Sequence, residues 1–520
     1  MADGTPAAGA TDGVTHRQPI RVIFAALMLV MFLASLDQTI VSTALPTIVG
    51  EFGGLAHLSW IVTAYLLATT IVTPLYGKLG DLFGRKIVLQ SAILLFLLGS
   101  ALCGISQSMV ELIGFRALQG LGGGGLIVTA MAAVGDIISP RERGRYQGIF
   151  GGVFGLSTVL GPLIGGFFVE HLSWRWIFYI NLPLVILAVA IIGWSFTAST
   201  ARGHPKIDFA GAGLLAIALT ALILLTSLGG HTFAWSSPEM LGMLAVAVSA
   251  LAGFIVVEHR AAEPILPLRL FGNRIFVVSC AIGLIVGLAM FGSVTFMPIY
   301  LQVVKGVSPS IAGLQLTPMM AGVLVTSIAS GQIISRIGRY RPFPIAGTAV
   351  MTTGLGLLAT LDARSSTWTA SGYMLVLGLG LGMVMQVLVL VVQNAVDYRE
   401  LGVATSGTTL FRSIGAAVGV SLFGAIFTAS LAANLASGLP SGASLPAATD
   451  PAAIQALPTP LRTVYLEAFT AALHPVFLSA AAVSSLGFAL SWFLKKCRCM
   501  DRCVVRQSAR ASPCRAMLPR

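Results

Sequence analysis

Apolar stretches of about twenty residues recur along this chain, and short polar joints separate them. A helix of that length rises about 30 Å, the thickness of a bilayer's hydrocarbon core. Only 10% of the residues are charged, and the mean hydropathy is +0.90. Because a helix satisfies its own backbone hydrogen bonds within lipid, we expect an all-α polytopic membrane protein.

The sequence predicts fourteen spans and therefore places both termini on one side of the membrane. The expected spans, in order, are 20–46, 57–77, 87–106, 111–135, 146–169, 175–196, 208–228, 239–258, 275–301, 309–334, 343–361, 368–394, 402–429 and 474–494. With the N-terminus inside, most of the 31 lysine and arginine residues fall in cytoplasmic segments. The positive-inside rule thus favours two cytoplasmic termini.

The first apolar run, Ile20–Pro46, is too long for the apolar core of a signal peptide and is interpreted as the first span. No N-x-[ST] sequon occurs in the chain. Both observations agree with a multi-pass protein of a bacterial inner (plasma) membrane.

A weak internal repeat divides the chain into two similar halves. The pattern Gly77-x3-Asp81-x2-Gly84-Arg85 recurs as Gly331-x3-Ser335-x2-Gly338-Arg339, and Arg141-Glu142-x-Gly144 recurs as Arg399-Glu400-x-Gly402. We expect two six-helix pseudo-repeat bundles plus two inserted helices. The predicted segments are a cytoplasmic tail 1–19, a bundle 20–196, a linker with the inserted helices 197–260, a bundle 261–494 with a long outer loop 430–473, and a basic cytoplasmic tail 495–520.

The formal net charge of +12 does not indicate a nucleic-acid partner, because much of it belongs to the C-terminal tail. A basic cluster beside a membrane is typical of contact with anionic lipids. The tail cysteines Cys497, Cys499 and Cys503 lack a zinc-binding spacing, and we expect no metal site.

Two charges inside the membrane need a reason, because each is costly there. Asp37 lies nine residues before the outer end of span one, and Arg116 lies five residues into span four, which starts outside. The two side chains are therefore predicted to reach each other in the outer half of the membrane. They either hold two helices in register or exchange a proton with solvent, and we favour the proton-coupling role for Asp37 and Arg116.

Five motifs together resemble the major facilitator superfamily, specifically its fourteen-span drug:proton antiporters, over most of residues 20–430. The motifs are Gly77-x-Leu79-x-Asp81-x2-Gly84-Arg85-Lys86, Leu36-Asp37-Gln38-Thr39-Ile40-Val41 through Pro46, Arg116-x2-Gln119-Gly120, Gly161-Pro162-Leu163-Ile164-Gly165-Gly166, and Trp174-Arg175-Trp176-Ile177-Phe178 with Asn181-Leu182-Pro183.

The resemblance implies that two bundles rock around a central site that opens to one side at a time. Asp81 would brace the second bundle, Arg85 would pair with Asp136, and Asp37 would carry the proton. The implied gate residues are Gly77, Asp81, Gly84, Arg85, Lys86 and Asp136, and the implied antiporter motif is Gly161, Pro162, Gly165 and Gly166.

These features predict a proton-coupled antiporter that exports amphipathic or cationic drugs and toxic compounds. The residues expected to line its cavity are Tyr65, Phe291, Phe296, Gln386 and Arg412. The alternative on the same fold is a proton-coupled importer of a small nutrient. Hydrolase and P-loop motifs are absent from the chain, so we expect a transporter and not an enzyme. We expect the proton gradient to drive it without a cofactor. We also expect it to be a monomer.

Overall fold

The computed structural model describes residues 20–52, 58–195, 207–229, 233–438, 454 and 458–495, and they are almost entirely helical. The helices of the N-terminal half are α1 (Ile20–Phe52), α2 (Leu58–Phe83), α3 (Arg85–Ile105), α4 (Met109–Ile137), α5 (Arg143–His171), the short α6 (Trp176–Tyr179) and α7 (Asn181–Ser195). A separate pair follows, α8 (Phe209–Leu228) and α9 (Pro238–Arg260).

The C-terminal half begins after the 3-10 turn η2 (Leu268–Gly272). Its helices are α10 (Arg274–Val294), α11 (Phe296–Val303), α12 (Pro309–Leu314), α13 (Thr317–Ile337), α14 (Pro342–Leu358), α15 (Thr367–Gln393), α16 (Leu401–Gly438) and α18 (Thr459–Ser491), with the 3-10 turn η3 (Tyr398–Glu400) before α16.

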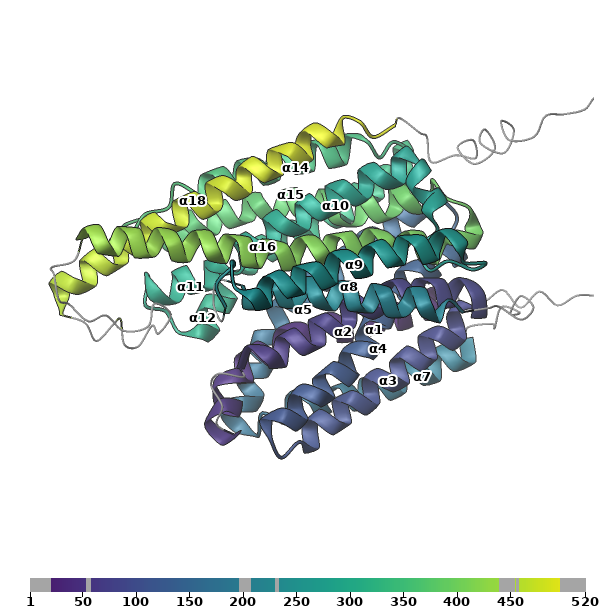
Figure 1. Ribbon diagram of the computed structural model, residues 1–520, viewed down its shortest axis with the longest axis horizontal. Coiled ribbons are helices and arrows are strands. Elements are labelled where there is room, and N and C mark those ends of the chain that lie inside the picture. The colour runs from purple at the N-terminus through teal and green to yellow at the C-terminus, as the bar shows by residue number, and fades with distance from the viewer. Residues whose placement is uncertain are drawn as a thin grey trace, which may run out of the picture.

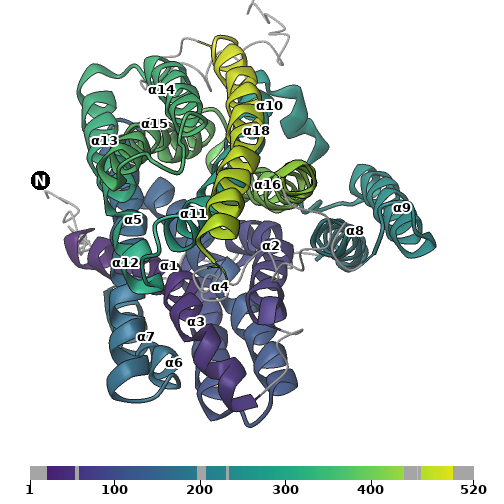
Figure 2. The same cartoon turned by 90° about the vertical axis from the view of Figure 1, so that its left-hand side faces the viewer.

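The two halves form two helix bundles that lie side by side (Figures 1 and 2). Each half has its own buried apolar core. The bundles meet where α2 packs against α16 and where α5 packs against α13. The α8–α9 pair lies at the periphery, with α8 against α2 and α16.

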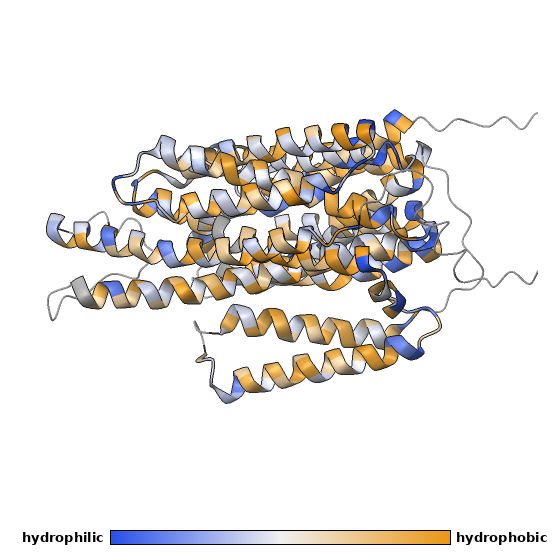
Figure 3. Cartoon of the chain, turned by 90° about the horizontal axis from the view of Figure 1, so that it is seen from above, coloured by the Kyte–Doolittle hydropathy of each residue, from blue (hydrophilic) through white to orange (hydrophobic). Residues whose placement is uncertain are grey.

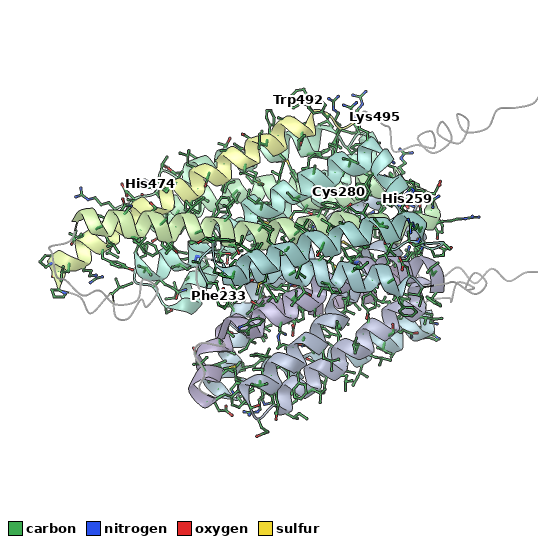
Figure 4. All side chains as sticks on the ribbon, in the orientation of Figure 1. Phe233, His259, Cys280, His474, Trp492 and Lys495 are labelled. Atoms are coloured by element: carbon green, nitrogen blue, oxygen red, sulfur yellow. The ribbon has the colours of Figure 1, made fainter. Side chains whose placement is uncertain are left out.

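Serine caps start several of these helices. The hydroxyls of Ser108, Ser237, Ser308 and Ser366 each accept a hydrogen bond from a backbone N–H in the first turn of α4, α9, α12 and α15. Hydrophobic residues occupy the helix lengths, and hydrophilic ones gather at the ends (Figure 3). His259 and Lys495 lie at one end of the molecule, while Phe233 and His474 lie toward the other (Figure 4).

Twelve helices in the described ranges are long and apolar enough to cross a membrane, so the prediction of fourteen spans is not supported by this measure. The two expected spans at 275–301 and 343–361 correspond to shorter apolar helices, Arg274–Met290 and Pro342–Leu358. The first of these segments is interrupted at Thr295, between α10 and α11. Pro298 follows three residues later, and a proline cannot continue the hydrogen-bond ladder of the preceding turn.

Helical structure occupies both ends of the predicted outer loop 430–473. Helix α16 continues to Gly438 and α18 already begins at Thr459. Both extensions are rich in alanine and leucine, which favour helix, and the Pro at the start of α18 occupies a first-turn position where it is tolerated. The 38-residue α16 is about 57 Å long at 1.5 Å per residue, well beyond the hydrocarbon core.

Several predicted segments lie outside the described residues. They are the tail 1–19, part of the linker at 196–206, and the basic tail from 496 onward.

Close packing of α10 on α16 generates a prediction about stability. A Cβ on Gly415 would overlap the carbonyl oxygen of Leu284, whereas a Cβ on Gly356 of α14 would meet nothing within 4 Å. We expect Gly415→Ala to destabilise the protein by about 1–3 kcal/mol, as overpacked cores do. Thermal unfolding of the purified protein in detergent measures this.

Gly356→Ala is the matched control, and we expect it to be neutral or slightly stabilising because alanine is the better helix former. Equal melting temperatures for the two variants would contradict the tight α10–α16 contact.

Candidate functional site

The Asp37 carboxylate lies fully buried inside the N-terminal bundle. The Arg116 guanidinium donates to its Oδ2 at 2.6 Å. Its Oδ1 accepts from the amides of Gln119 at 2.8 Å and Asn181 at 3.3 Å. Helices α1, α4 and α7 thus supply a carboxylate and three donors to one site. The structure brings the two charges together, as the sequence predicted.

A second layer orients these donors. The Ser100 hydroxyl accepts from Gln119 at 3.1 Å and from Asn181 at 2.9 Å, and it donates to the Phe178 carbonyl. Arg116 also donates to Gln119 Oε1 at 2.7 Å and to the Ile61 carbonyl. Satisfied hydrogen bonds on both ions are the condition under which a buried pair is tolerated.

The sequence analysis did not single out Ser100, and it named Gln119 and Asn181 only as parts of motifs, with no contact to Asp37 assigned to them. Gln119 carried a usable signal, because it lies three residues after Arg116 and so on the same helix face. Asn181 begins a helix whose remaining residues are almost all apolar, which marks its polar side chain as unusual. Ser100 had no signal, since single serines are common within spans.

The network is built around a single carboxylate, that of Asp37. Protonation would remove the negative member of the pair. Arg116 would still have Gln119 Oε1 and the Ile61 carbonyl as acceptors. The local contacts would therefore rearrange with the protonation state of one carboxyl group.

Tyr65, which was predicted to line the cavity, lies in this site. Its ring packs under the Arg116 guanidinium at 4.2 Å, a cation–π contact, and the side chain is buried. The aromatic face stabilises the guanidinium and shields it from solvent.

The glycines of the expected antiporter motif bring α5 close to α1 beside Asp37. A Cβ on Gly161 would overlap Oγ1 of Thr39, and a Cβ on Gly165 would overlap Oγ1 of Thr43. Pro162 contacts Gly313 of α12, in the other half. Gly166 is half-buried on the same helix. The motif thus lies between the Asp37 helix and the second bundle.

A second polar site joins the two bundles at one end of the molecule. The Asp81 carboxylate accepts from the backbone N–H groups of Gly402 at 3.0 Å and Val403 at 2.9 Å, in the first turn of α16. Arg85 donates to Asp81 and to Asp136, the latter at 2.9 Å. A helix N-terminus attracts an anion through its free N–H groups and its dipole. We call Asp81, Arg85 and Asp136 the latch.

Two glycines permit the latch geometry. A Cβ on Gly77 would overlap the Ser406 hydroxyl, so only glycine lets α2 approach α16 this closely. Gly84 joins α2 to α3 with φ of 89°, in the left-handed region that glycine favours. Lys86, predicted as a gate residue, instead donates to the Gly193 carbonyl at the end of α7 and does not take part in the latch.

The repeat in the second half forms a reciprocal contact. The Ser335 hydroxyl accepts from the Arg145 N–H at 3.0 Å in the first turn of α5. A Cβ on Gly331 would overlap the Gly144 carbonyl, as one on Gly77 would approach the Gly402 carbonyl. Each half thus places its glycine-containing helix end on the N-terminus of a helix from the other half. Only the first contact contains an acid.

Between these two contacts lies a polar layer that sequence reasoning missed. Arg143 donates to the Gln393 carbonyl at 3.2 Å and to the Asn394 side chain at 3.0 Å. Gln147 of α5 donates to Gln393 of α15 at 3.2 Å, and Gln393 donates to Thr405 of α16 at 3.0 Å. These side chains close the interface between the bundles at the latch end.

The remaining residues expected in a cavity have different surroundings. Phe296 is buried in the core of the C-terminal half, 5.2 Å from the Phe427 ring, and does not face the other bundle's helices. Gln386 is buried between the halves beside Gly151. Arg412 is half-buried on α16. The side chain of Phe291 lies outside the described set.

Within the described residues, no group of three or more His, Cys, Asp or Glu side chains could hold a metal ion.

Comparison with known proteins places this geometry in a family. The Major Facilitator Superfamily profile matches residues 27–420. An uncharacterised transporter of that type from Mycobacterium tuberculosis strain H37Rv is 45% identical over 92% of this chain and 70% of its own length. The multidrug transporter protein MdtP of Bacillus subtilis strain 168 is 41% identical over 77% of this chain and 74% of its own.

Among solved structures, the fold is similar to that of the proton:xylose symporter XylE. The TM-score is 0.63 at 13% sequence identity, covering 92% of this chain and 97% of that one.

The burial of the Asp37–Arg116 pair generates a prediction. Arg116→Gln removes one partner of a buried ion pair, so we expect a loss of about 3–5 kcal/mol of stability. The double variant Arg116→Gln with Asp37→Asn should recover part of that loss, because no lone charge remains. Denaturant unfolding in detergent measures both.

The matched control is Arg175→Gln, which breaks the exposed 2.9 Å pair with Glu51. We expect it to cost less than about 1 kcal/mol. If Arg116→Gln costs no more than this control, the buried network does not stabilise the bundle.

The latch generates a prediction about access. A cysteine at position 406, in a background without other cysteines, should react slowly with a membrane-impermeant maleimide because Ser406 is buried behind Gly77. Asp81→Asn removes the charge that holds the α16 N-terminus. We expect it to raise the labelling rate at least about tenfold, the effect of losing a charge-assisted contact of about 1.5 kcal/mol or more.

Lys86→Gln in the same loop is the control and should leave the rate unchanged, because its contact is with α7. A rate that responds equally to both variants would contradict the latch.

Proposed function

The chain belongs to the Major Facilitator Superfamily and is a transporter, not an enzyme; from this we propose that it exports amphipathic compounds in exchange for protons. The proposal assigns it to the fourteen-span drug:proton antiporter branch. Asp37 is the proton-carrying group and Arg116 its partner.

The observation that carries this proposal is the closed hydrogen-bond network of Asp37. A carboxylate buried in a bundle is costly, and its remaining lone pairs need donors besides the arginine. Here two amides and an arginine, supplied by two other helices, converge on one acid. Because the helices α1, α4 and α7 all contribute, a change in the charge of Asp37 would alter their packing and couple protonation to bundle shape.

The state of the interface supports alternating access. The latch and the Gln393 layer hold the bundles together at one end, which the charge rule assigns to the cytoplasm. At the other end, the inter-bundle contact of α5 is the packing of Pro162 against Gly313 of the short helix α12. If the bundles separate at the outer end while the latch keeps the cytoplasmic end closed, protons reach the protein from outside.

Export is supported by the relatives' names. The Bacillus subtilis relative at 41% identity is named a multidrug transporter, and a second one at 33% identity is named multidrug resistance protein 3. We carry that activity to this chain as part of the proposal.

We further propose that α10 and α14 also cross the membrane, which gives fourteen spans with both termini in the cytoplasm. Both are apolar, and each packs against two long helices of the C-terminal half, α10 against α16 and α18, and α14 against α15 and α18. The site of action is then a bacterial plasma membrane. The protein works as a monomer, the proton gradient supplies the energy, and anionic lipids contact the tail beyond 495.

The test is proton release on ligand binding, followed by transport. In weakly buffered detergent solution, a cationic dye (ethidium) and an anionic dye (8-anilinonaphthalene-1-sulfonate) are each added, and whichever binds should displace a proton from the wild-type protein but not from Asp37→Asn. In everted vesicles whose lumen is more acidic than the medium, the wild-type protein should accumulate the dye in the lumen, and Asp37→Asn should lose this accumulation.

Glu170→Gln, an exposed acid at the end of α5, is the control and should behave as wild type. Normal gradient-driven pumping by Asp37→Asn would overturn the mechanism. Uptake of a nutrient down an inward proton gradient without efflux would favour the importer alternative.

A further inference from the structure

Helix α16 carries an arginine in the membrane interior with no protein partner in the described part of the chain. Arg412 lies eleven residues after the start of α16, about 16 Å along its axis and close to mid-depth. Among the described residues it makes no hydrogen bond or ion pair, in contrast to Arg85 and Arg116. A charge at this depth costs at least about 2.5–3.5 kcal/mol, so its retention needs a reason.

The helix period directs Arg412 toward the interface between the bundles. Thr405, Thr409, Arg412 and Ala416 share one face of α16, and Thr405 on that face accepts from Gln393 in the inter-bundle layer. Thr405 and Thr409 are buried, whereas Arg412 and Ala416 are half-buried. Accessible space on this face therefore begins at Arg412, on the side of the polar layer away from the latch.

Gln386 lies at the same depth on the neighbouring helix. Helices α15 and α16 run in opposite directions, and Gln393 bonds Thr405 across them. Gln386 is seven residues before Gln393 and Arg412 is seven residues after Thr405, so both lie two turns, about 10 Å, above that bond and on the same helix faces. Gln386 is 5% exposed, and its Oε1 has no hydrogen-bond partner. The register of the two helices thus gives an unsatisfied buried amide and an unpaired guanidinium the same depth, and both could hydrogen-bond a polar ligand.

The described acids of the membrane interior form ion pairs with other arginines and not with Arg412. Asp37 is held by Arg116, and Asp81 and Asp136 are both held by Arg85. Among the described residues, no acid is left to compensate the charge of Arg412.

We propose that Arg412 and Gln386 anchor an anionic oxygen group, so the exported compounds are amphipathic carboxylates, sulfonates or zwitterions. This inference rests on the proposed transport function and names its substrate class. The guanidinium gives charge-assisted hydrogen bonds to a planar or tetrahedral anion, and the Gln386 amide adds one neutral hydrogen bond. An organic cation at the same place would be repelled by Arg412. Cationic drugs, which composition alone favoured, would then be the poorer ligands.

The test uses four probes on one naphthalene ring, so that size and apolar area stay matched. They are 2-naphthoate, naphthalene-2-sulfonate, 2-naphthylmethanol and 2-naphthylmethylammonium. Equilibrium dialysis against the purified full chain measures each Kd. We expect the wild type to bind both anions at least about tenfold more tightly than the ammonium compound, with the alcohol between them.

Arg412→Gln should abolish this order, Arg412→Lys should retain part of it, and Gln386→Leu should weaken anion binding a few-fold. Arg364→Gln, an exposed arginine between α14 and α15, is the control and should keep the wild-type order. The proposal is overturned if the wild type binds no anion, if it prefers the ammonium compound, or if Arg412→Gln keeps the preference.

Stability separates this role from a structural one. Without ligand, Arg412→Gln should melt at the same temperature as wild type or higher, because it removes an uncompensated buried charge. A structural arginine would instead give a lower melting temperature and equal losses for all four probes.

The outcome is also independent of transport. Anion-selective binding without proton-driven export would refute the proposed function and keep this site. Proton-driven export of cations that Arg412→Gln leaves unchanged would do the reverse.

Discussion

The two bundles depend on a carboxylate placed at a helix N-terminus. Asp81 accepts from two backbone N–H groups in the first turn of α16, and Arg85 pairs with both Asp81 and Asp136. The contact forms only because Gly77 lets α2 approach α16 within backbone distance. Ser335 and Gly331 make the corresponding contact on α5 without a charge. The Asp81 contact with α16 therefore depends on charge, whereas the Ser335 contact with α5 consists of packing and one neutral hydrogen bond.

Two arginines inside the membrane show opposite solutions to the cost of a buried charge. Arg116 is paired with Asp37, hydrogen-bonded to Gln119 and covered by the Tyr65 ring, so its charge is compensated within one bundle. Arg412 is half-buried on α16, near Gly283 of α10, and has no hydrogen bond or ion pair among the described residues. A transporter that couples protons to an acidic substrate needs two kinds of charged site. In one, the charge is paired within the protein and the pair can separate, and in the other the charge is paired only when a ligand binds.

Much of the site was predictable, because its chemistry sits in local motifs. Rise per residue was enough to place Asp37 and Arg116 at matching depths, and the residue spacing of the repeat located the two inter-bundle contacts. The failures have a common cause. Tyr65 and Phe296 were expected in a cavity, and Lys86 in the gate, because each has a suitable side chain, but helix rotation turns them toward their own bundle or toward α7. Ser100 was missed, because a single serine within a span does not show which neighbour it contacts.

The sequence by itself determined that the chain is a helical membrane protein with two related halves, because hydropathy and glycine–charge spacing are properties of consecutive residues. It overestimated the outer loop, since the alanine-rich ends of α16 and α18 are helical without being markedly apolar. Only the tertiary structure decided which polar groups meet. The donors on Asp37, the Gln393 layer and the isolation of Arg412 arise from contacts between residues far apart in the chain. Such contacts depend on how each helix is rotated about its axis, and packing sets that rotation.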